Sequence, residues 1–118
     1  MIIIEGKAGK SRVLQDIINN QMRNRSVVVF DSVGIRGLRV PDGVQHFMLD
    51  GASVEEVVEE FMNNAFQFYE IDWIVFSVNA DIMSFDLGIF KNLDRRYNHN
   101  FIITVQNNAL DEVNVYYA

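Results

Sequence analysis

Continuous apolar runs alternate along the chain with segments in which apolar residues recur at helical spacing. The runs carry β-branched and aromatic residues without polar interruption, which is typical of strands buried on both faces. They are Ile2–Ile4, Val27–Phe30, Trp73–Val78 and Phe101–Val105. The segments between them show apolar residues three and four apart, which predicts helices over 11–22, 53–65 and 84–97. Weaker patterns indicate a short strand over 44–49 and a final alternating strand over 113–117.

Local signals mark several element ends. Ser53 is followed three residues later by Glu56, the spacing of a capping box, so the second helix begins at Ser53. Residues 32–44 contain Gly34, Gly37, Pro41 and Gly43 and are expected to form a loop. Turns are expected at 98–100 and 107–111, because both segments are rich in Asn and Asp.

Strands that alternate with helices favour an α/β fold, since each helix returns the chain to start another parallel strand. The pattern predicts three layers: a mainly parallel sheet of five or six strands with helices on both faces. The sequence shows no repeat, linker or low-complexity tract, so residues 1–118 are interpreted as a single domain.

Composition and charge narrow the function classes. The 118 residues include no Cys, which excludes disulfides, a thiolate nucleophile and cysteine–zinc sites. The formal net charge of −6 disfavours direct DNA binding by this chain alone. No apolar run reaches the roughly 20 residues that span a bilayer, and Met1 is not followed by signal-peptide features. These observations predict a cytoplasmic protein without a membrane association.

The strongest chemical signal is Gly6-Lys7-Ala8-Gly9-Lys10-Ser11, between the first strand and the first helix. Unpaired N–H groups at a helix start and the helix dipole favour a phosphate there. Gly9-Lys10-Ser11 matches the end of the phosphate loop G-x-x-x-x-G-K-[ST], in which lysine contacts phosphate and the hydroxyl contacts Mg²⁺. The first glycine, Gly6, lies three positions before Gly9 instead of five, so the loop is two residues short. The alternative interpretation is a tight strand-to-helix turn with two surface lysines.

With this motif placed, the chain resembles a reduced P-loop NTPase, and within that class the FtsK/HerA-type and RecA-like ATPases. Three stretches carry the resemblance: 2–14, 27–34 and 93–106. It implies a P-loop NTPase-like fold that binds Mg-ATP or ADP. The implied nucleotide-binding residues are Gly6, Lys7, Ala8, Gly9, Lys10, Ser11 and Asp31, with Ser11 on the magnesium. Gln106 would be a polar sensor, and Arg95 or Arg96 would act as an arginine finger toward a neighbouring subunit.

One departure from the family concerns hydrolysis. The strand in the Walker B position, Trp73–Val78, leads to Asn79, and the nearest carboxylate is Asp81. Serine or asparagine is no strong base at neutral pH, so the sequence predicts binding more firmly than hydrolysis. Residues 31–34 also have the D-x-x-G form of GTPases, but the guanine-reading N-K-x-D motif is absent, and GTPase chemistry ranks lower.

Each candidate residue has a structural alternative. Asp31 could cap its own loop, and Gln106 could bond the 107–108 turn. Arg95 and Arg96 could complement the helix dipole. His46 and His99 lack metal-ligand spacing. The acidic positions 55, 56, 59 and 60 are read as a solvated helix face or a dock for a basic partner, and the tyrosines at 116 and 117 as packing residues or a subunit edge.

Two functions therefore stay open. The first is a nucleotide-binding domain that resembles a minimal translocase ATPase, in which any hydrolysis needs an arginine from a neighbouring subunit. The second is a non-catalytic interaction module that regulates or mimics a related ATPase or another partner. Both imply a protein partner or a homo-oligomer. The small size is, by analogy, common in phage and mobile-element proteins.

Overall fold

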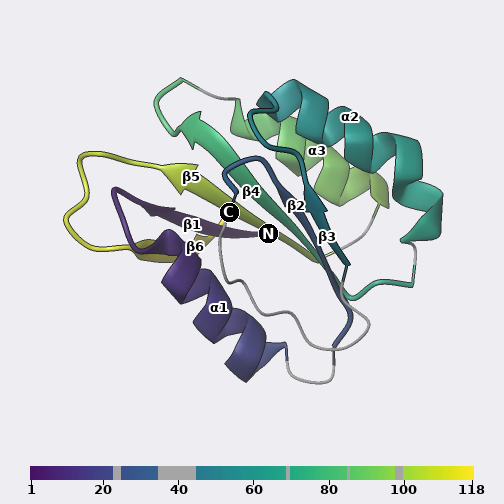
Figure 1. Ribbon diagram of the computed structural model, residues 1–118, viewed down its shortest axis with the longest axis horizontal. Coiled ribbons are helices and arrows are strands. Elements are labelled where there is room, and N and C mark those ends of the chain that lie inside the picture. Colours follow the sequence, from purple (N-terminus) through teal and green to yellow (C-terminus); the bar gives the residue numbers. More distant parts are fainter. Residues whose placement is uncertain (23–24, 35–44, 69, 85, 98–99) are drawn as a thin grey trace.

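The computed structural model describes the chain except for residues 23–24, 35–44, 69, 85 and 98–99. Within these described residues, six strands form one sheet in the order β3-β2-β4-β5-β1-β6 (Figure 1). Their bounds are β1 Ile2–Gly6, β2 Val27–Asp31, β3 Gln45–Met48, β4 Trp73–Asp81, β5 Asn100–Gln106 and β6 Asn114–Tyr117. The helices are α1 Lys10–Gln21, α2 Val54–Asn64 and α3 Leu87–Tyr97, with a short 3-10 turn, η1, at Ala65–Gln67.

The predicted three-layer fold of P-loop NTPase type was wrong, although most strand pairs of the sheet are parallel as expected. The sheet is mixed, because β6 pairs with β1 antiparallel, with Ile3 opposite Tyr116. The connection over 107–113 is too short for the crossover of about a dozen residues that a parallel strand needs, so β6 can only return in the opposite direction. The helices are also distributed unevenly: of the described helices, α1 lies on one face of the sheet, while α2 and α3 lie on the other (Figure 1).

The individual elements follow the hydrophobic pattern closely. The capping box is confirmed, because the Ser53 hydroxyl accepts from Glu56 N at 3.1 Å and the Glu56 carboxylate accepts from Ser53 N at 3.2 Å. The third helix begins at Leu87, later than expected, and β4 continues to Asp81, beyond a register shift after Ser77. Most of the expected 32–44 loop lies outside the described residues.

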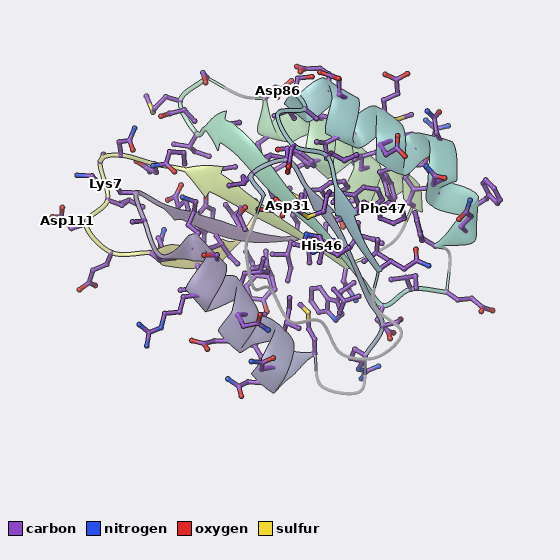
Figure 2. All side chains as sticks on the ribbon, in the orientation of Figure 1. Lys7, Asp31, His46, Phe47, Asp86 and Asp111 are labelled. Carbon is purple, nitrogen blue, oxygen red and sulfur yellow. The ribbon has the colours of Figure 1, made fainter. Side chains whose placement is uncertain are left out.

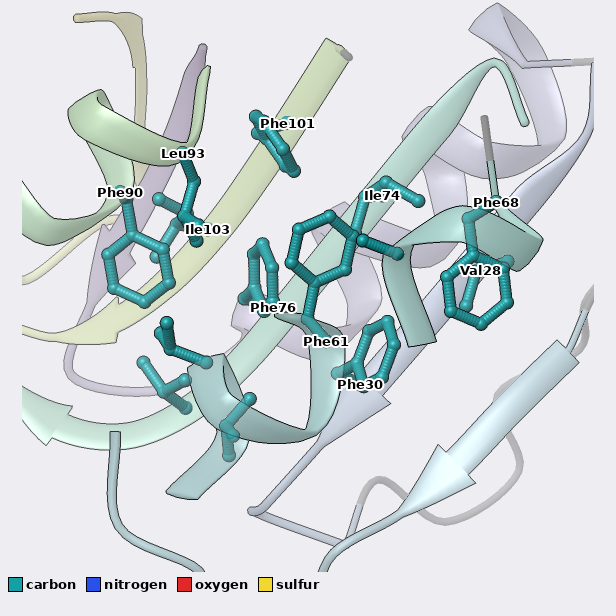
Figure 3. Close-up of a cluster of buried hydrophobic side chains, with 14 of the residues drawn as sticks. Val28, Phe30, Phe61, Phe68, Ile74, Phe76, Phe90, Leu93, Phe101 and Ile103 are labelled. Carbon is teal, nitrogen blue, oxygen red and sulfur yellow. The ribbon is translucent and has the colours of Figure 1, made fainter. Parts of the chain in front are cut away.

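The described residues form two apolar clusters, one packed against each face of the sheet. The larger lies under α2 and α3 and is rich in phenylalanine, which supplies six of its sixteen buried residues (Figure 3). Its centre is Phe61, whose ring contacts Phe30 at 5.8 Å and Phe76 at 5.5 Å between centroids, both edge to face. The second cluster lies under α1 and is mainly aliphatic, with Ile4 and Leu14 fully buried. Burial on both faces explains why the strand sequences read as unbroken apolar runs. No described helix has the length and apolar character needed to cross a membrane.

Candidate functional site

The carboxyl ends of four parallel strands meet at one edge of the sheet and leave a hollow there. Its volume is about 280 Å³, and it is lined by Gly9, Lys10, Ser11, Val33, Gly34, Ser77 and Thr104. Ligands of open α/β sheets bind outside this edge, because loops and helix starts converge on it. The lining brings together segments that follow β1 and β2 with residues of β4 and β5. The hollow is therefore the candidate site of this protein.

The β1–α1 loop contributes a helix start without a side-chain cap. Gly9 is the N-cap residue and has a φ of 85°, a left-handed conformation that favours glycine. In the described part of the chain no side chain caps the helix, and its first turn contains no acidic residue. At Gly6 a Cβ atom would lie 3.2 Å from the Val113 side chain and 3.3 Å from its Cα, so the loop also packs closely on the segment before β6. The amides of the first helical turn are thus available to an anion beside Lys10 and Ser11.

Among the described lining residues, Lys10 is the cation of the hollow. Its ammonium group donates to the Gly6 carbonyl at 3.0 Å and to Gln106 Oε1 at 2.7 Å. Burial lowers the pKa of Lys10 from its usual value of 10.5, since desolvation disfavours the charged form. The Gln106 amide in turn donates to the Lys7 carbonyl at 2.8 Å and to Asn108 Oδ1 at 2.7 Å. Gln106 therefore ties the β1–α1 loop to the turn after β5.

Two buried hydroxyls lie beside this lysine. Thr104 Oγ1 lies 3.1 Å from Ser77 Oγ, and both residues are 2% exposed. The pair has two hydroxyl hydrogens, and the bond between them uses one. For the other, no acceptor is found among the described residues. A buried donor that faces a hollow is satisfied when a ligand oxygen accepts from it.

Asp31 lies behind the wall opposite the helix start. The residue is fully buried, and its Oδ1 accepts from the amides of Val33 and Gly34 at 2.9 Å each. Its Oδ2 lies 3.0 Å from His46 Nε2, and Figure 2 shows the two side chains together. Asp31 therefore caps its own loop, which is the structural alternative for this residue. Both of its carboxylate oxygens have protein partners.

His46 is the partner that sequence reasoning missed. Its spacing to other candidate ligands does not fit a metal site, so the sequence gives it no role. The contact arises from the parallel pairing of β2 with β3, in which Val29 lies opposite His46. No spacing rule predicts that pairing, because the connection between the two strands can have any length.

Other predicted site residues lie elsewhere. Lys7 is at the exposed tip of the β1–α1 loop (Figure 2), and neither it nor Ala8 lines the hollow. Arg95 bonds the Asn92 side chain at 3.1 Å, and the Arg96 guanidinium lies 5.3 Å from the Tyr97 ring centre. Both arginines end α3, at the edge of the sheet where β5 begins, so they cannot reach the hollow of their own chain.

The acidic residues that could bind a metal or a basic partner are also separate from the hollow. Within the described ranges, no three His, Cys, Asp or Glu side chains gather in a way that could hold a metal ion. Asp81 accepts from Met83 N at 2.9 Å and lines a different hollow beside α2. Glu56, Glu59 and Glu60 line a third, on α2 itself. His99 lies outside the described residues. Tyr116 is partly buried, while Tyr117 is 80% exposed on β6.

Comparisons with protein-family models, with curated proteins and with solved structures found no match to this chain.

Proposed function

We propose that the chain binds the phosphate groups of a nucleotide, ATP or ADP, in the hollow at the start of α1, and that it does not hydrolyse the nucleotide by itself. The observation that carries the proposal is the convergence of three kinds of donor on one hollow. They are the Lys10 ammonium, the uncapped first turn of α1, and the buried hydroxyls of Ser77 and Thr104.

Charge complementarity supports an anionic ligand. Lys10 is partly buried and has only neutral oxygens as the hydrogen-bond partners found, the Gly6 carbonyl and the Gln106 amide. A phosphate oxygen would replace one of them with an acceptor of opposite charge, so that the ammonium hydrogen bond would also become an ion pair. The dipole of α1 adds partial positive charge at the same point.

The size of the hollow indicates which part of the nucleotide it holds. About 280 Å³ is just below the roughly 300–1,000 Å³ of complete small-molecule pockets. The hollow therefore suits a phosphate chain, with the ribose and base outside it. Affinity should come mainly from phosphates, so pyrophosphate should compete with ADP.

Magnesium would enter with the ligand. Of the oxygens of the hollow, Ser11 provides a hydroxyl next to the predicted phosphate position, and no carboxylate is among the lining residues found. Mg²⁺ prefers carboxylates and phosphates and keeps several waters, so this donor set fits an ion already held by the phosphates. When bound, the ion would neutralise phosphate charge, and Ser11 would supply one ligand or contact one of its waters.

The proposal excludes self-sufficient hydrolysis because a base is missing from the hollow. Hydrolysis requires a group that orients or activates water, and the described lining has none that can accept a proton at neutral pH. The cytoplasm, where nucleotides are abundant, is the compartment that this proposal implies.

A non-catalytic interaction module is the second candidate. Strand β6 ends the described sheet and carries no charged residue, and its Val115 and Tyr117 side chains are 45% and 80% exposed. Uncharged edge strands pair readily with other chains. Under this alternative, β6 is the surface through which the chain meets a protein partner or a second copy.

The deciding experiment is calorimetric titration with ADP and ATP, with and without Mg²⁺, on the parent chain, Lys10→Ala and Lys7→Ala. The two variants remove the same charge, from the β1–α1 loop at Lys7 and from the helix start directly after it at Lys10, but only Lys10 lines the hollow. We expect Lys10→Ala to weaken binding by about tenfold or more, and Lys7→Ala to change it little. Absence of saturable binding by the parent, or equal affinities for the parent and Lys10→Ala, would overturn the proposal.

A further inference from the structure

We infer that the hollow selects its anion by protonation state: the ligand oxygen that lies against Ser77 and Thr104 carries no hydrogen, so the site takes fully ionised tetrahedral oxyanions, sulfate as well as phosphate. The inference deepens the proposed function and rests on it for the place of the anion. It names the chemical class of group that the buried end of the hollow accepts.

Ser77 and Thr104 continue an apolar face of the sheet. Because side chains alternate along a strand, Ser77 shares a face of β4 with Val75. On β5, Thr104 shares the same face with Ile102. Val75 and Ile102 are fully buried in the cluster under α1, and the two hydroxyl residues lie opposite each other one step further along. The apolar face therefore ends in a pair of hydroxyls where the hollow begins.

This pair has one hydrogen to give to a ligand. Thr104 Oγ1 and Ser77 Oγ lie 3.1 Å apart, and one of their two hydroxyl hydrogens forms the bond between them. The second hydrogen finds no acceptor in the described part of the chain. Both residues are 2% exposed, and a buried donor without an acceptor is costly. The ligand oxygen at this place therefore accepts a hydrogen bond, which an oxygen without a hydrogen of its own does best.

The other polar side chains of the hollow agree with this requirement. The Lys10 ammonium gives two of its three hydrogens to the Gly6 carbonyl and to Gln106, which leaves one for the ligand. The Ser11 hydroxyl can donate or accept. None of the lining residues that the structure describes carries a carboxylate, since Asp31 lies behind the wall. A carboxylate is the group that would accept from a protonated anion and repel one without a hydrogen.

Sulfate and inorganic phosphate differ in this property. Both are tetrahedral anions, but at neutral pH sulfate carries no hydrogen, whereas inorganic phosphate carries at least one. A site of donors binds sulfate at least as tightly as phosphate, while a site with a carboxylate acceptor binds phosphate and rejects sulfate. A phosphate monoester loses its last hydrogen at about pH 6, and the terminal phosphate of a nucleotide behaves similarly, so a nucleotide also meets the requirement at neutral pH.

The experiment titrates the parent chain with sodium sulfate or sodium phosphate at neutral pH, without nucleotide or Mg²⁺, and follows the amides by NMR. Sodium chloride keeps the ionic strength constant, so a general salt effect appears equally in both series. We expect both anions to shift the amides of Gly9, Lys10 and Ser11, and sulfate to bind at least as tightly as phosphate.

Variants of the hydroxyl pair test its part in this selection. Ser77→Ala and Thr104→Val each leave one hydroxyl, whose hydrogen can go to the ligand. The double variant leaves none. We expect sulfate affinities within about threefold of the parent's in the single variants and about tenfold lower in the double variant. Urea unfolding of each variant shows that it is folded, and a folded double variant that binds sulfate as the parent does overturns the inference.

The outcomes separate this inference from the proposed function. Weaker binding of sulfate than of phosphate, or no shift at the start of α1 with either anion, overturns the inference. Binding of both anions by a chain that does not bind ADP overturns the proposed function and still supports the inference. Binding of ADP and phosphate with rejection of sulfate does the reverse.

Discussion

The ammonium nitrogen of Lys10 lies 2.7 Å from the side-chain oxygen of Gln106, a residue 96 positions later in the sequence. The contact follows from the parallel pairing of β1 with β5, which places Gly6 opposite Gln106. Lys10 reaches both residues because it begins the helix directly after the loop. The cation of the candidate site is therefore held by the last residue of another strand.

Gln106→Glu should weaken ADP binding by about tenfold or more, because a carboxylate beside Lys10 forms a charge-assisted pair that competes with phosphate. Calorimetric titration measures the change. Asn107→Asp is the matched control: it adds the same charge one residue away, and its side-chain oxygen can still accept from Ala109 N. Equal losses in both variants would mean that net charge, not the pairing of Lys10, controls affinity.

Because of Lys10, the free energy of unfolding of the chain should change with pH in the alkaline range. Burial lowers its pKa from 10.5, so between the lowered value and 10.5 the unfolded chain binds more protons than the folded one. Stability should therefore rise with pH across this window, and the rise should be absent in Lys10→Met. Urea unfolding of both proteins at a series of pH values tests this. Parallel curves for the two proteins would contradict the expectation.

Gly9→Ala and Gly51→Ala should lower stability similarly but differ in binding. Both glycines have positive φ, 85° and 75°, so an alanine costs about 1 to 2 kcal/mol at either position. A Cβ atom at Gly51 would contact nothing within 4 Å, and Gly51 does not line the hollow. Unfolding midpoints should fall in both variants, while only Gly9→Ala should weaken ADP binding. A comparable loss of binding in Gly51→Ala would show that stability alone explains the effect.

Hydrogen bonds between Ser26, just before β2, and Asp72, just before β4, should contribute stability that is lost in acid. The Asp72 carboxylate accepts from the Ser26 amide and from the Ser26 hydroxyl, both at 3.0 Å. Both bonds lower the pKa of Asp72 from 3.8, and the bond from the backbone amide has the larger effect. Stability from these bonds is present above pH 3.8 and is lost as pH falls through the lowered pKa. Ser26→Ala should therefore reduce the urea midpoint at neutral pH, and the difference from the parent should shrink in acid. A difference that stays constant with pH would exclude this linkage.

Much of the local structure could be predicted because its causes lie within a few residues. Helix α2 is an example: Ser53 and Glu56 cap each other, and the apolar stripe that includes Phe61 follows directly. The boundaries of α3 and β4 were less accurate, since a register shift between β4 and β5 lengthens the strand. The direction of β6 depends on its partner strand β1, with which it pairs antiparallel. The expected sheet architecture was wrong at this strand.

The sequence by itself determined the alternation of buried strands with helices and the glycine–lysine–serine segment at the start of α1. Both depend on residues that are neighbours along the chain, where spacing dictates geometry. Only the tertiary structure decided that Lys10 meets Gln106, that Ser77 meets Thr104, and that Asp31 turns away from the hollow toward His46. These contacts join different strands, and their distances are set by strand order and register. The order and register come from packing the whole apolar surface at once, which no local spacing encodes.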